Sequence, residues 1–79
     1  MAWRVVEHDD RRWQVSIAAE RRANSPYWSL VFAFRPTDNG QRSFWATYPL
    51  SSASKAALFA QAEQLPDHAI AAFLAEQLQ

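Results

Sequence analysis

The sequence predicts a small α+β domain: a four-stranded antiparallel sheet, built from two β-hairpins, followed by two short C-terminal helices packed on one sheet face. Three observations predict it. Apolar and polar residues alternate over about 3–49, turn-forming residues divide this stretch into two hairpins, and after Pro49 the apolar spacing becomes helical. With 79 residues, 49% of them hydrophobic, we expect a single domain over residues 1–79 with one core.

The first hairpin is predicted around Asp9-Asp10-Arg11, between runs 3–8 and 12–18. A three-residue loop pairs Val5 with Val15 and separates two faces. The predicted inner face carries Trp3, Val5, Trp13, Val15 and Ile17. The predicted outer face carries Arg4, Val6, His8, Arg12, Gln14 and Ser16. Because a two-residue loop would mix these sets, we predict the three-residue loop.

The second hairpin is predicted around Asp38-Asn39-Gly40, which holds the one glycine of the chain. A two-residue turn at Asn39-Gly40 would pair Phe34 with Trp45 and spread large apolar groups over both faces. A three-residue loop pairs Phe34 with Ala46 instead. One face then carries Trp28, Leu30, Phe32, Phe34, Phe44, Ala46 and Tyr48, and the other carries Ser29, Val31, Ala33, Arg35, Ser43, Trp45 and Thr47. The polar stretch 20–26 is expected to be a surface connection between the hairpins.

Two helices are predicted over about 52–65 and 67–78, separated by Pro66. Ser51, Ser52 and Ser54 are candidate N-caps of the first helix, and Asp67 of the second. Apolar residues recur at helical spacing in both, as Leu58, Phe59, Ala62 and Leu65, and as Ile70, Phe73, Leu74 and Leu78. These stripes are expected to face the sheet.

The charge balance argues against a strongly anionic partner. Eight basic residues offset eight acidic ones, although all the arginines lie between Arg4 and Arg42. No cysteine and no long apolar segment occur, so we expect a cytoplasmic protein without a membrane span.

Catalytic, cofactor-binding and metal-binding residues are not predicted, so we expect a protein that is not an enzyme. Turn and cap chemistry accounts for Asp9, Asp10 and the serines, and one glycine cannot form a glycine-rich phosphate loop. A ligand-sized hollow lined by His8 or His68 together with acidic residues would favour an enzyme instead.

The outer sheet face is the predicted interaction surface, through Arg4, Arg12, Gln14, Arg35 and Trp45. The arginine stems could simply cover Trp45 from water. Alternatively, the face binds protein, either a second copy in a homodimer or a larger partner of an accessory or immunity-type protein. A third interpretation is single-stranded nucleic-acid binding, with phosphates on Arg4, Arg12 and Arg35 and a base stacked on Trp45. Because the net charge is zero, we favour a protein partner.

Overall fold

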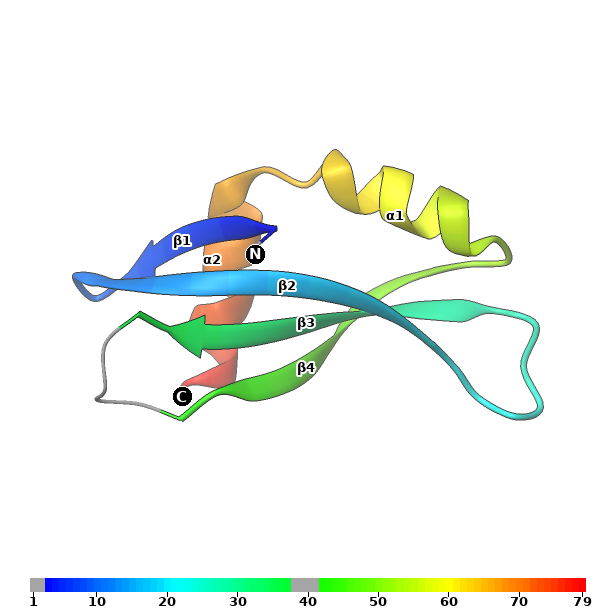
Figure 1. The fold of residues 1–79 in the computed structure, drawn as a ribbon, viewed down its shortest axis with the longest axis horizontal. Helices are drawn as coiled ribbons and strands as arrows, with labels where there is room; N and C mark the ends of the chain where they lie inside the picture. The colour runs from blue at the N-terminus through cyan, green and yellow to red at the C-terminus, as the bar shows by residue number, and fades with distance from the viewer. Residues whose placement is uncertain (1–2, 38–41) are drawn as a thin grey trace.

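The computed structural model describes residues 3–37 and 42–79, so the predicted turn at Asp38-Asn39-Gly40 lies outside the described residues. Four antiparallel strands form one sheet in the order β1-β2-β3-β4, and two helices follow (Figure 1). The predicted α+β fold is therefore confirmed. The elements are β1 (Arg4–His8), β2 (Arg11–Arg21), β3 (Trp28–Pro36), β4 (Phe44–Ser52), α1 (Lys55–Glu63) and α2 (Asp67–Gln77).

Both helices pack on one face of the sheet, which we call the inner face. Strands β2 and β3 place Val15 opposite Phe34 and Ile17 opposite Phe32 on this face. The buried residues of α1 and α2 join the same cluster, and α2 crosses behind the strands in Figure 1. Neither α1 nor α2 covers the opposite, outer face.

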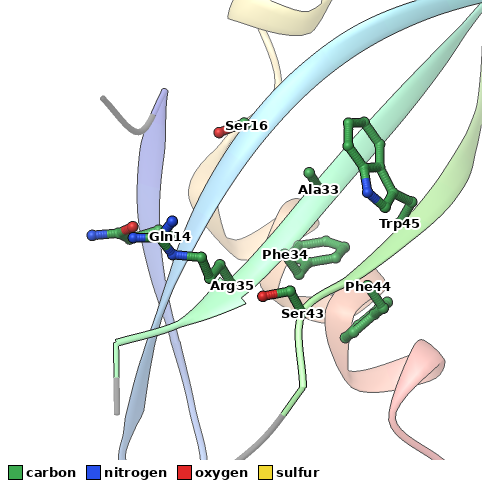
Figure 2. Close-up of a pocket in the computed structure, with 8 residues that line it drawn as sticks. All are labelled: Gln14, Ser16, Ala33, Phe34, Arg35, Ser43, Phe44 and Trp45. Carbon is green, nitrogen blue, oxygen red and sulfur yellow. The ribbon is translucent and has the colours of Figure 1, made fainter. Parts of the chain in front are cut away.

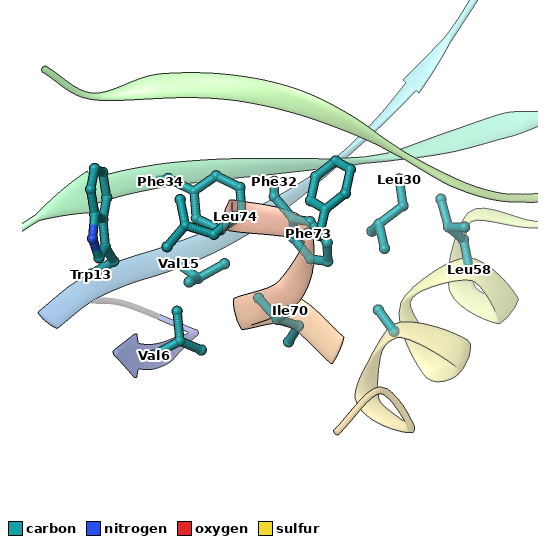
Figure 3. Close-up of a cluster of buried hydrophobic side chains, with 11 residues drawn as sticks. Val6, Trp13, Val15, Leu30, Phe32, Phe34, Leu58, Ile70, Phe73 and Leu74 are labelled. Atoms are coloured by element: carbon teal, nitrogen blue, oxygen red, sulfur yellow. The ribbon is translucent and has the colours of Figure 1, made fainter. Parts of the chain in front are cut away.

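The core is an aromatic cluster between the inner face and the helices (Figure 3). Phe32 is its centre, with ring contacts to Trp3, Phe34, Tyr48 and Phe73 at centroid distances of 5.2–6.0 Å. Such rings bury a large apolar area with few rotatable bonds, which suits a short chain. Leu58, Ala62, Ile70 and Leu74 of the helices are fully buried in this cluster. The helical stripes were therefore predicted correctly for most residues. The exceptions are Leu78, which is exposed, and Phe59, which is half-buried and lies outside the core cluster.

The predicted register of the first hairpin is wrong by one residue. His8 pairs with Arg11 across a two-residue turn, and Val5 pairs with Gln14 instead of Val15. Asp9 and Asp10 have φ angles of 51° and 63°, as a type I′ turn requires, and aspartate tolerates this region better than most residues. Because side chains alternate along a strand, the shift turns β1 over. Val6 is consequently buried and Val5 exposed.

The second hairpin pairs Phe34 with Phe44, so the predicted partner, Ala46, is wrong by two residues. Phe44 is the residue that a three-residue loop over 38–40 sets opposite Phe34, because position 37 then faces position 41. A shift of two keeps every side chain on its predicted face. The inner set from Trp28 to Tyr48 therefore packs on the core, and Trp45 lies on the outer face as expected. The face assignment is confirmed although the pairing is not.

Strands β2 and β4 extend further than predicted where they pair with the start of β3. A register irregularity at Ser29/Leu30 lets Ser51 and Ser52 continue β4 beyond Pro49. Strand β2 likewise runs through Glu20 to Arg21, whose guanidinium carbon lies 5.1 Å from the centre of the Trp28 ring. Pairing to β3 thus converts the start of the expected loop into strand.

The helix starts are decided by local hydrogen bonds. Ser54 is the N-cap of α1, because its hydroxyl oxygen accepts a hydrogen bond from the Ala57 N–H at 3.2 Å. Asp67 is not a cap: α2 follows the extended Pro66, and Asp67 is its first helical residue. No helix in the described ranges is long and apolar enough to span a membrane.

Candidate functional site

Among the described residues of the outer sheet face, the one large aromatic side chain that is exposed is Trp45, at 68%. The remaining tryptophans differ from it: Trp13 is buried, and Trp3 and Trp28 pack partly buried against the core. Trp45 lies on β4 directly across from Ala33 of β3, which in turn lies across from Ser16 of β2. The neighbouring side chains in its row are therefore small, so they leave one side of the indole uncovered.

A hollow of about 540 Å³ occupies this space. Figure 2 shows Trp45 on one side of Ala33, with the side chains of Gln14 and Arg35 on the other. Gln14 and Arg35 are cross-strand partners in the next row of the outer face. The hollow is lined by Gln14, Ser16, Ala33, Phe34, Arg35, Ser43, Phe44 and Trp45.

The hollow combines an apolar wall with polar groups. The Trp45 ring offers a flat apolar surface, while Gln14, Ser16 and Ser43 supply amide and hydroxyl groups. Arg35 is exposed and adds a positive charge. In residues 3–37 and 42–79 no acidic side chain forms an ion pair with Arg35. A ligand with an apolar side chain beside a carboxylate would match both the Trp45 ring and the positive charge of Arg35.

Arg4 is not part of this surface, contrary to the prediction. The one-residue register shift places it opposite Val15, on the inner face. There its guanidinium donates hydrogen bonds to the main-chain oxygens of Leu65, Glu63 and Ala62 at the end of α1, and to the Asp67 carboxylate. Its side chain is only 17% exposed. Arg4 therefore joins the sheet to the helices and is unavailable to a partner.

Arg12 does lie on the outer face, but outside the hollow. Its cross-strand partner on β1 is Glu7, so the register brings an acidic residue beside it on the same face. Of the five residues predicted to form the interaction surface, Gln14, Arg35 and Trp45 are brought together, Arg12 stands apart, and Arg4 is excluded.

The histidines line two smaller hollows. One hollow, of about 440 Å³, is lined by His8, Asp9, Arg11, Trp13 and Leu78. The other, of about 280 Å³, is lined by His68 together with Glu7 and Asp67. His8 Nε2 is 3.3 Å from Asp9 Oδ2. Both linings thus join a histidine to acidic residues, the combination that would favour an enzyme. Their carboxylates are open to water, however: the side chain of Asp9 is 86% exposed and that of Asp67, which is bonded to Arg4, is 70% exposed. In the part of the chain described, no three His, Asp or Glu side chains are placed to hold a metal ion.

The small residues of the hollow were placed on the outer face from the sequence, but their role was missed. Ser16 and Ala33 form its floor only because the register puts them in one row with Trp45. The signal in the sequence was a small residue at the middle of each of two neighbouring strands.

Comparison with protein-family models, curated proteins and solved structures found no match.

Proposed function

We propose that this protein is a non-catalytic interaction module that binds another protein through the hollow beside Trp45. The observation that carries the proposal is a tryptophan 68% exposed on a regular strand, with an uncovered hollow against its ring. Tryptophan and arginine dominate the energetics of protein interfaces, and a tryptophan side chain has only two rotatable bonds to fix on binding. An accessory role toward a larger protein fits this arrangement.

The chemistry of the hollow suggests the kind of segment it accepts. An apolar or aromatic side chain would pack on the Trp45 ring over Ala33, and a neighbouring carboxylate would meet Arg35 and Gln14. Both interactions are available without rearranging the sheet.

Single-stranded nucleic acid is the weaker alternative. Arg4, one of the three arginines it required, is bonded to the α1–α2 connection, and Arg12 lies across from Glu7. Arg35 alone would then hold phosphate near Trp45, whereas affinity for nucleic acid depends on several such contacts.

The test is a comparison of immobilised wild type with Trp45→Ala and Tyr27→Ala. Tyr27 is 55% exposed and does not line the hollow, so it is a matched aromatic control. We expect that a partner protein binds wild type and Tyr27→Ala with similar affinity. The same partner should bind purified Trp45→Ala with an affinity about 30-fold lower. Arg35→Ala should weaken the same complex.

Equal binding by all variants would contradict the proposal. Binding of fluorescent oligonucleotides that falls steeply with salt and is lost in Trp45→Ala would favour the nucleic-acid alternative instead.

A further inference from the structure

The two edges of the sheet are protected to different degrees. The edge strand β1 has five residues, among them Arg4, Glu7 and His8, and α2 packs along it. The edge strand β4 has nine residues and no charged side chain. Natural sheets block open edges with charges, short strands or covering elements, because unpaired strands associate. The edge at β4 has none of these over its first half.

The main chain of β4 is available on its outer side. Within the described residues β4 pairs with β3 alone, and in Figure 1 no element lies beyond it at the lower edge of the sheet. The N–H and C=O groups of every second residue between Phe44 and Tyr48 therefore point away from the molecule. Pro49 has no N–H, so it cannot donate a hydrogen bond to an added strand.

Apolar side chains are also left part-exposed along this edge. Phe44, Ala46 and Tyr48 face the core but remain half-buried, whereas Phe32 and Phe34 on β3 are fully buried. Below them a groove of about 440 Å³ runs between β4 and α2. It is lined by Tyr48, Pro49, Ala69, Ala72, Phe73 and Glu76. A strand added to β4 would cover both the side chains and part of this groove.

We infer that the strand added is β4 of a second copy, paired antiparallel over Phe44–Tyr48 with the two-fold axis at Ala46. In this register Phe44 of each copy lies opposite Tyr48 of the other, and Trp45 lies opposite Thr47. Aromatic pairs stabilise such ladders, and no like charges meet because the strand has none. The zero net charge of the chain adds no repulsion between copies.

This dimer goes beyond the proposed function, since it uses the strand edge and the groove and leaves the hollow open. It joins the outer faces of the two copies into one eight-stranded sheet with two hollows. A partner with two binding segments would then be held more tightly than by one copy.

The test is sedimentation equilibrium of wild type and Thr47→Glu from low to high micromolar concentration. Thr47 is exposed on the outer face, so glutamate is tolerated in the monomer, but in the dimer it lies against Trp45 of the other copy. We expect wild type to dimerise and the variant to dissociate at least ~10-fold more readily. Val5→Glu places the same charge on the exposed side of β1 and should dimerise like wild type.

A wild type that stays monomeric throughout, or a dimer unaffected by Thr47→Glu, would overturn the inference. Circular dichroism checks that the variant folds. If it does not, amide hydrogen exchange of wild type decides: outward-pointing amides between Phe44 and Tyr48 should exchange more slowly at high concentration. Exchange that is independent of concentration would likewise overturn the dimer.

Discussion

The guanidinium of Arg4 lies 3.1 Å from the carboxylate of Asp67, although the two residues are far apart in the sequence. The same guanidinium bonds the last main-chain oxygens of α1, where a positive charge is favoured by the helix dipole. One side chain of the first strand thus holds the connection between the two helices.

Arg4→Ala is therefore expected to lower the free energy of unfolding by about 1–3 kcal/mol, because part-buried carbonyl groups lose their donor. Arg12→Ala, which removes an arginine from the exposed outer face, should change it by less than ~0.5 kcal/mol. Urea unfolding of both variants measures the difference, and equal losses would contradict the role assigned to Arg4.

Asp67→Asn should cost less than Arg4→Ala, about 0–1 kcal/mol. The Asp67 side chain is 70% exposed, and an ion pair so open to water contributes little. A loss in Asp67→Asn as large as that in Arg4→Ala would mean that the ion pair, and not the bonds to α1, is the main contribution.

Val5 and Val6 test the register of the first hairpin. Val6 is 4% exposed and Val5 is 40% exposed. Val6→Ala should cost about 2 kcal/mol and Val5→Ala less than ~0.5 kcal/mol, as measured by chemical denaturation. The reverse order would support the three-residue loop.

The turn at Asp9-Asp10 gives a second, independent test. Glycine suits the left-handed conformation of position 10, so Asp10→Gly should raise the free energy of unfolding by about 0.5 kcal/mol. Asp10→Ala should lower it by about 1 kcal/mol, because a Cβ is unfavourable at positive φ. Thermal unfolding distinguishes the two, and a loss of stability in Asp10→Gly would contradict this turn.

Trp45 should contribute little to the stability of a single copy. At dilutions where the chain is monomeric, Trp45→Ala should cost less than about 1 kcal/mol, since most of the ring is already in water. Trp13→Ala, which empties a buried site, should cost about 3–5 kcal/mol. If the Trp45 variant unfolded as readily as the Trp13 variant, Trp45 would have to be regarded as a structural residue.

The two hairpins show where prediction from the sequence was strong and where it failed. In the second hairpin the aromatic and aliphatic residues of the inner face alternate with smaller or polar ones at every outer position except Trp45, and an error of two residues in pairing left every face correct. In the first hairpin Val5 and Val6 are equivalent by hydropathy. The choice between them depended on whether the turn had two or three residues, and an error of one reversed the strand.

Local pattern by itself determined the order of strands and helices, the inner face of the last two strands, and the exposure of Trp45, because these depend on period and on neighbouring turn residues. Only the tertiary structure decided the side on which Arg4 lies, since its partners belong to the α1–α2 connection at the other end of the chain. It also decided which small side chains meet beside Trp45. Cross-strand rows are set by pairing between distant residues, and no local pattern records them.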